Sequence, residues 1–253
     1  DYDRSSPWLD DDSPGHGASY ANMEGRIIAG NTFDFVFKHG QAIRDAGYSF
    51  FSVSDEVFEK SRFERADYFA VDMVYGEERG TEGLLKSTGK NYRVWTAPMR
   101  EAVSTYLESG GNIFVSGAYI GTDMFENEDS LSIMFAEEIL HYKWRTNHAD
   151  NVGSVEVTDE ALSLFLPFLK YNVDFKRDIY KVEAPDGLEP SGDGASRIFR
   201  YASNGVSAGV AYSGHYRSVV LGFPFETVVK QQQRHLLMKQ ILSFFARNMG
   251  NDI

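Results

Sequence analysis

The sequence predicts an α/β fold, a three-layer sandwich in which helices cover both faces of a mostly parallel central sheet. Antiparallel strands are expected to extend that sheet toward the C-terminus. Helical and strand-like segments alternate through the first half, and the apolar run at 67–74 suits a strand covered on both faces. Short strands joined by tight turns follow in the last hundred residues. We expect one domain over residues 1–253, with an irregular extension at 1–40 and the core at 41–250.

The first half of the chain carries clear starts and stops of helices. Gly47 ends the first helical pattern, since glycine readily adopts the left-handed conformation that closes a helix. Thr96, followed by Pro98 in the first turn, is typical of a helix start. Acidic Asp55 and Glu56 after Ser54 mark another. The expected order is helix 38–46, strand 48–53, a helix from 55, strand 67–74, helix 96–109, a strand from 112 and helix 130–140.

The second half changes to the two-residue alternation of strands. Turn sequences such as Ser203-Asn204-Gly205 and Ser213-Gly214-His215 separate these segments and predict hairpins. The final segment, 233–247, has the apolar spacing of an amphipathic helix that packs on the sheet. The expected strands are 152–157, 178–183, 197–201, 205–212 and 216–223.

Composition excludes several classes of function. The chain has 253 residues, 42% of them hydrophobic, which is ample for a core. Its net charge of −12 argues against a nucleic-acid partner, which requires clustered Lys and Arg. The absence of cysteine excludes disulfides, thiolate catalysis and Cys-ligated zinc. No apolar run reaches the length of roughly 18–20 residues that a membrane span needs.

The stretch 110–123 is the predicted centre of a site. A short apolar strand follows Gly110-Gly111 and ends in a turn that contains Gly117 and Gly121. In α/β sheets ligands bind at the carboxyl ends of strands, where backbone N–H groups can stabilise negative charge. The turn's apex offers alanine and tyrosine, neither of them a good nucleophile. The predicted ligand-binding residues in this stretch are Ser116, Gly117, Ala118, Tyr119 and Thr122.

Catalytic candidates come from general acid–base chemistry, which needs two titratable groups within reach of the substrate. Asp123 and Glu226 could serve as acid or base, with Tyr119, His215 or His16 as the partner. Tyr119 has a structural alternative, since a tyrosine at this position is more often packed against the following helix than catalytic. Ser116 is a further nucleophile candidate, although a serine on a buried strand is more often a small core residue.

Two further clusters carry weaker predictions. Trp144 and Arg145 could form a ligand subsite, because aromatic faces stack on sugar rings and arginine binds carboxylates; a helix C-terminus is the alternative. Asp10, Asp11 and Asp12 could bind calcium, but consecutive aspartates lack the spacing of an EF-hand loop, and a solvated acidic loop is favoured. We therefore predict no cofactor, with calcium as a minor possibility.

The helix–strand alternation, the glycine turn and the late segment 219–227 together resemble the class I glutamine amidotransferase-like fold, a flavodoxin-like arrangement. The likeness spans roughly residues 40–247. The resemblance implies a Cys on the turn and a His-Pro-Glu segment after a late strand. Here the turn has Ala118-Tyr119 and the late segment reads Phe223-Pro224-Phe225-Glu226, so the Cys-His-Glu triad is not retained.

The amino-acid sequences of several segments also resemble a module of exported Bacteroidota proteins that are labelled xanthan lyase-like or hypothetical. These segments are 30–34, 110–112, 116–121 and 222–226. That resemblance implies export to the periplasm or the cell surface, and a carbohydrate-related parent protein whose other domains, with a possible glycan, would be the partners.

We therefore expect a noncatalytic binding or assembly module, and lean against an enzyme. The alternative is a hydrolase or lyase with a rebuilt acid–base site at the turn, and a metal-dependent function is a third hypothesis.

Overall fold

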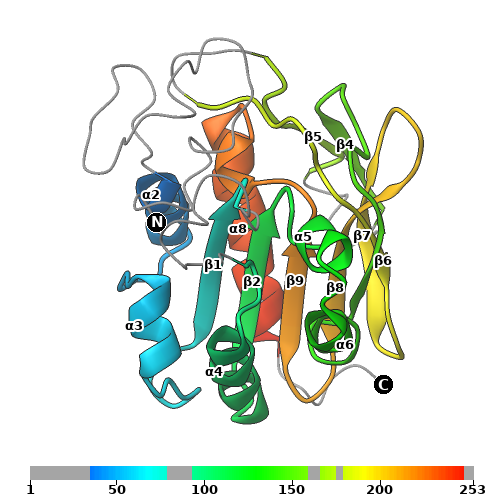
Figure 1. Cartoon of the computed structure of the whole chain (residues 1–253). Helices are drawn as coiled ribbons and strands as arrows, with labels where there is room; N and C mark the ends of the chain where they lie inside the picture. Colours follow the sequence, from blue (N-terminus) through cyan, green and yellow to red (C-terminus); the bar gives the residue numbers. More distant parts are fainter. Residues whose placement is uncertain (1–34, 79–92, 159–165, 175–178, 248–253) are drawn as a thin grey trace, which may run out of the picture.

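The computed structural model describes residues 35–78, 93–158, 166–174 and 179–247. A seven-stranded sheet runs through the molecule in the order β1-β2-β9-β8-β7-β4-β5, and a separate two-stranded sheet pairs β3 with β6 (Figure 1). The predicted cation ligands Asp10, Asp11 and Asp12, together with His16, lie outside the described residues, so these predictions are untested.

Three neighbouring strands of the large sheet are parallel. β2 (Asn112–Gly117) lies between β1 (Ala70–Gly76) and β9 (Arg217–Leu221). All residues of β2 and β9 are buried, which fits their apolar sequences. The carboxyl ends of these strands meet at one edge of the sheet, at the top of Figure 1.

The rest of the sheet is antiparallel. β9 pairs with β8 (Ser207–Ser213), β8 with β7 (Ala195–Tyr201), β7 with β4 (Ser154–Val157) and β4 with β5 (Phe168–Lys170), all antiparallel. β3 (Tyr142–Thr146) and β6 (Gly187–Pro190) form the small antiparallel sheet.

The predicted fold class is therefore wrong. Of the six pairings in the large sheet two are parallel and four are antiparallel, so the sheet is mixed and curled, not the mostly parallel centre of a three-layer sandwich. A continuous apolar run indicates that both faces of a strand are buried, but it does not indicate the direction of the neighbouring strands. For example, β8, whose neighbours are antiparallel, is almost as fully buried as β2. Residues 48–53, moreover, form no strand.

Helices pack against both faces of the large sheet (Figure 1). α4 begins after Thr96, whose side chain accepts a hydrogen bond from the Met99 N–H at 3.1 Å, with Pro98 in its first turn as the sequence predicts. The helices are α2 (Phe35–Asp45), α3 (Asp55–Lys60), α4 (Ala97–Glu108), α5 (Thr122–Glu126), α6 (Ser130–Glu138), the 3₁₀ turn η1 (Phe225–Thr227) and α8 (Gln231–Ala246).

Two hydrophobic cores result, one on each face. The first contains Phe114 and Phe225 together with the inward side of α8, including Leu237. The second contains Trp95 and Tyr106 with the inward sides of α4 and α6. Among the described residues, no helix has the length and apolarity to cross a membrane.

Candidate functional site

The turn after β2, where the sequence predicts a site, is filled by a side chain of the protein itself. The Asp186 carboxylate accepts hydrogen bonds from the backbone N–H of Gly121 (2.6 Å) and Thr122 (3.0 Å) and from the Thr122 hydroxyl (2.5 Å). Asp186 is completely buried. Burial raises the pKa of its carboxyl to about 7, although hydrogen bonds from the turn and from Trp144 oppose the rise. The N–H groups that could have stabilised a bound anion are thus occupied.

The predicted residues of this turn are correspondingly enclosed. Ser116, Ala118, Tyr119 and Thr122 are all buried, and the Thr122 hydroxyl accepts a hydrogen bond from the Trp144 indole at 2.9 Å. Asp123, also buried, accepts hydrogen bonds from the Val94 N–H (3.0 Å) and the Asn127 side chain (3.1 Å). These groups fix the turn in the structure.

The remaining predicted residues lie apart from one another. Trp144 stacks on Phe125, with ring centroids 4.0 Å apart. Arg145 points to solvent and pairs with Glu189 at 2.6 Å. His215 lies at the amino ends of the parallel strands, where its Nε2 is 3.1 Å from the Glu108 carbonyl. The structure therefore does not bring His215 together with Asp123 or the turn.

Glu226 has titratable partners, in a cluster that the sequence did not predict. The imidazole of His39, on α2, lies between two carboxylates: its Nδ1 is 2.8 Å from Asp72 Oδ2 and its Nε2 is 3.3 Å from Glu226 Oε2. The Tyr180 hydroxyl donates to Glu226 Oε1 at 2.7 Å. We call these four residues the His39 cluster.

Three different elements position the His39 cluster. Asp72 projects from β1 toward α2, because its neighbours Val71 and Met73 belong to the opposite core. Glu226 lies in η1, directly after β9, and Phe225 beside it packs edge-on against the His39 ring at 4.6 Å. Aromatic packing thus holds the imidazole in place at the boundary between strand ends and helix.

The charges of the His39 cluster favour an imidazolium. Burial alone would lower the pKa of His39, but the charges and hydrogen bonds of Asp72 and Glu226 outweigh it and raise the pKa to about 9. His39 is therefore protonated at neutral pH. Burial, reinforced by the nearby charges of Glu226 and Glu77, raises the pKa of Tyr180 well above its usual value, so its hydroxyl remains a proton donor.

The His39 cluster lies beside the turn after β2. A Cβ added to Gly76, the last residue of β1, would lie 3.5 Å from Glu226 Oε1 and 3.4 Å from the Tyr180 hydroxyl. The carbonyl of Gly76 in turn accepts a hydrogen bond from Ala118 N–H at 2.8 Å. Glu226 and Tyr180 therefore lie at the carboxyl ends of the parallel strands, the edge where α/β sheets bind ligands, whereas Asp72 lies within β1.

Two features show that the His39 cluster is incompletely paired. Asp72 Oδ1 is buried and has no hydrogen-bond partner among the described residues, although the side chain as a whole is 17% exposed. The contact of 3.3 Å between His39 and Glu226 is longer than the roughly 2.7–2.9 Å of a charge-assisted hydrogen bond. Buried polar atoms rarely lack partners, so the unpaired oxygen indicates room for a water molecule or a ligand hydroxyl.

The comparisons with known proteins assign no family. No protein-family model and no curated protein matches the sequence. One solved structure that the chain matches is "Exo-beta-1,4-mannosidase Op5Man5 from Opitutaceae bacterium strain TAV5", with 8% sequence identity and a TM-score of 0.48. The match covers 83% of this chain and 30% of the mannosidase chain. At this level of similarity it gives no information on activity or substrate.

The resemblance to class I glutamine amidotransferases is also corrected. That family is expected to have a mostly parallel sheet, whereas most pairings here are antiparallel, and no family model supports the assignment. The likeness to xanthan lyase-like proteins of Bacteroidota finds no support either. The resemblance rested on a glycine turn and a Gly-Phe-Pro-Phe-Glu segment, features that a strand end of a mixed sheet can also carry.

Proposed function

We propose that the protein is a hydrolase whose acid–base pair is His39 and Glu226. The observation that carries the proposal is the His39 imidazole held between two carboxylates, Asp72 within β1 and Glu226 just after the carboxyl end of β9. Strongly perturbed titratable groups at such an edge are typical of catalytic sites. The sequence predicted an acid–base site at the turn after β2. The proposed site is the neighbouring His39 cluster, which contains Glu226 but none of the other predicted catalytic residues.

The geometry of the His39 cluster assigns a role to each group. Glu226 takes a proton from a water molecule whose oxygen bonds to the electrophilic atom of the substrate. The departing oxygen takes the proton of His39 Nε2, which is available at neutral pH because the pKa is about 9. Asp72 orients the imidazole through Nδ1, and the Tyr180 hydroxyl holds Glu226. The substrate enters between His39 and Glu226, whose contact of 3.3 Å is the longest in the cluster.

Hydrolysis of small chromogenic substrates tests the proposal. The intact chain would be assayed against a panel of p-nitrophenyl glycosides and p-nitrophenyl esters, beside Glu226→Gln. General acid–base groups contribute roughly 10²–10⁴-fold, so we expect kcat/KM to fall by at least about 100-fold in Glu226→Gln on whichever probe is cleaved. Glu189→Gln is the matched control, because Glu189 pairs with exposed Arg145 far from the cluster.

Circular dichroism of the same samples would show that both variants are folded. Unchanged turnover in folded Glu226→Gln would contradict the proposal, and so would an equal loss in Glu189→Gln. Absence of turnover on every probe would favour the second candidate function, described next.

A noncatalytic binding or assembly module is the second candidate. The observation that favours it is burial: His39 and Glu226 are 2% and 1% exposed, and Asp186 fills the turn. In that case the His39 cluster is an ionic tie between α2, β1 and η1. Other domains of a parent protein, a glycan and export to the periplasm or cell surface remain proposals that come from sequence alone.

A further inference from the structure

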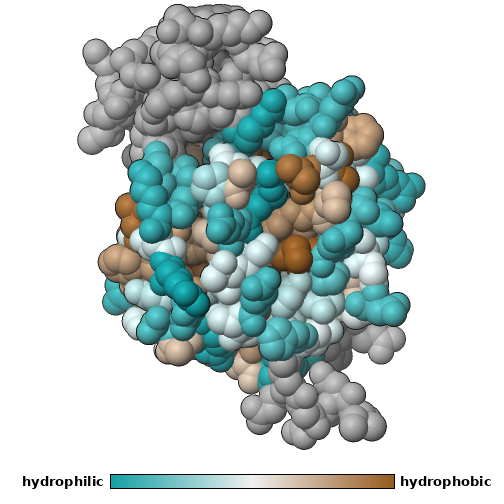
Figure 2. Space-filling view, turned by 60° about the horizontal axis from the view of Figure 1, so that its bottom comes forward, coloured by the Kyte–Doolittle hydropathy of each residue, from teal (hydrophilic) through white to brown (hydrophobic). Residues whose placement is uncertain are grey.

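A second site lies at the opposite end of the parallel strands from the His39 cluster. Figure 2 turns the molecule so that this end comes forward and shows hydrophilic side chains interspersed with apolar patches. A cavity of about 270 Å³ opens there, between the starts of β2 and β9 and the end of α8. Its polar lining consists of Arg65, Asn112, His215, Tyr216, Arg217 and Arg247.

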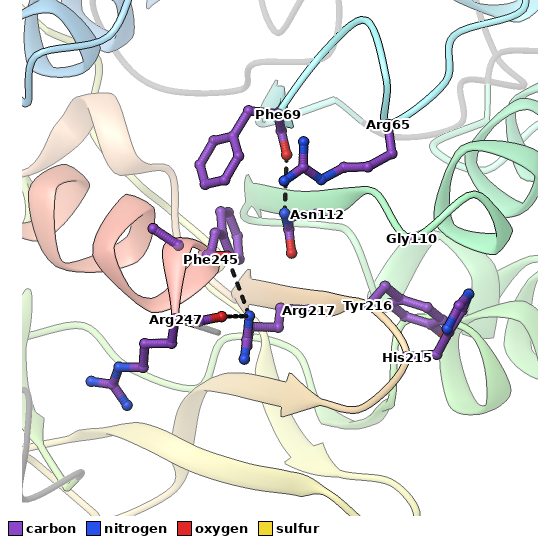
Figure 3. A pocket seen from close by; sticks show the side chains of 10 residues that line it. Arg65, Phe69, Gly110, Asn112, His215, Tyr216, Arg217, Phe245 and Arg247 are labelled. Atoms are coloured by element: carbon purple, nitrogen blue, oxygen red, sulfur yellow. Dashed lines mark hydrogen bonds between the residues drawn. The ribbon is translucent and has the colours of Figure 1, made fainter. Parts of the chain in front are cut away.

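Positive charge gathers in this cavity although the chain as a whole carries −12. Figure 3 shows the guanidinium groups of Arg65 and Arg217 on either side of the Asn112 side chain, while Arg247 extends toward the rim. No Asp or Glu belongs to the described lining. The side chain of Arg65 lies over the Phe69 ring, 4.9 Å from its centroid, and forms no ion pair in the part of the chain that the structure describes.

Capping of helix ends accounts for part of this charge but not for all of it. Arg217 Nη1 donates to the carbonyls of Arg247 (2.7 Å) and Phe245 (3.3 Å). Phe245 lies in the last turn of α8, and Arg247 directly follows the helix. The C-terminus of α4, at Gly110, also faces the cavity. Each helix C-terminus carries about half a negative charge, so the two ends offset roughly one of the three arginine charges in the described lining.

The cavity is built to hold a small group. Arg217 is 3% exposed and fixed by its two carbonyl contacts, so its charge is preorganised. The Asn112 amide nitrogen is fixed by donation to the Phe69 carbonyl at 3.0 Å. A Cβ added to Gly110 would meet no atom within 4 Å, which shows that this wall of the cavity is open.

We propose that this cavity binds a small oxyanion, a carboxylate or phosphate group of a ligand, with Arg65 as the principal movable contact. Arginine presents planar N–H pairs that match both groups. The Asn112 side chain lies between the two arginines, whereas the Tyr216 hydroxyl donates to the Ile139 carbonyl at 2.6 Å and leaves only its ring to the cavity wall. The site is separate from the proposed hydrolase site and does not depend on it.

Isothermal titration calorimetry of the intact chain at low ionic strength tests the proposal, with sodium phosphate and sodium glucuronate as separate probes and glucose as the uncharged control. We expect saturable binding of at least one anion, and none of glucose. Arg65→Gln should weaken binding by at least about tenfold, the effect of losing roughly 1.4 kcal/mol. Arg62→Gln is the matched control, because Arg62 is 77% exposed and pairs with Glu64 outside the cavity.

Binding of phosphate alone or of glucuronate alone would support the proposal and identify the group recognised. Absence of binding for both anions would overturn it. An equal loss in Arg62→Gln and Arg65→Gln would also overturn it, since that result would show attraction to surface charge in general.

Discussion

Replacing His39 with alanine should lower the free energy of unfolding by roughly 3–5 kcal/mol at pH 7, the usual cost of breaking a buried ion pair from one side. The imidazolium is the cation that His39 supplies between the Asp72 and Glu226 carboxylates, and Glu226 is 1% exposed. Its removal leaves two like charges facing each other in a largely buried space. The loss should persist at pH 5, because the stabilisation linked to the raised pKa of His39 is fully present below pH 6.5.

Urea unfolding at pH 7 and pH 5 measures this effect. Arg145→Ala is the control, since the exposed pair of Arg145 with Glu189 should contribute less than about 1 kcal/mol. A His39→Ala variant as stable as the control would contradict the ionic arrangement of the cluster. That outcome would weaken both candidate functions, because each depends on the same buried charges.

Replacing Asp186 with alanine should cost a similar amount, roughly 3–5 kcal/mol, by leaving buried donors without an acceptor. Three donors lose their partner: the N–H groups of Gly121 and Thr122 and the Thr122 hydroxyl. The turn after β2 should then open locally, since nothing else in the described contacts ties these N–H groups. Asp186→Asn should cost much less, because its amide oxygen still accepts from both N–H groups.

Asp129→Ala provides the control for this comparison. Asp129 caps α6 by accepting a hydrogen bond from the Ser132 N–H at 3.0 Å, on the partly exposed surface, and such caps contribute about 1 kcal/mol. Denaturant unfolding of the three variants gives the ranking. Equal losses in Asp186→Asn and Asp186→Ala would show that the charge of Asp186, and not its acceptor atoms, stabilises the turn.

Local signals in the sequence predicted local structure well. Thr96 with Pro98 identified the start of α4, and the apolar run after Gly110-Gly111 identified β2 and the turn that follows. These features depend on neighbours along the chain. Strand direction depends instead on which strands become neighbours in space: β9 lies beside β2 although about 100 residues separate them, and nothing in either segment records that pairing.

The site was harder to predict for the same reason. Glu226 was a candidate because the segment Phe223-Pro224-Phe225-Glu226 resembles a His-Pro-Glu segment, but its partner His39 lies 187 residues away. Asp72 did carry a signal, since a charged residue within a buried apolar strand needs a partner. The sequence gives no signal that Asp186 fills the turn after β2, because Pro185-Asp186-Gly187 alone is an ordinary turn sequence.

His39 is a buried imidazolium held by two carboxylates, those of Asp72 and Glu226. The raised pKa implies that the cluster stabilises the fold fully below pH 6.5, the usual value for histidine, and that this stabilisation is lost as the pH rises through about 9. His141 is an internal reference, because burial lowers its pKa against a weaker opposing hydrogen bond from Ser191.

The most direct test is a pH titration of the histidine side chains by ¹⁵N NMR, with His39 assigned from the spectrum of His39→Gln. The structure predicts that His39 keeps both ring protons through pH 8 and titrates near pH 9, whereas His141 titrates below 6.5. A His39 midpoint at or below 6.5 would show that Asp72 and Glu226 do not hold an imidazolium, and would contradict the account.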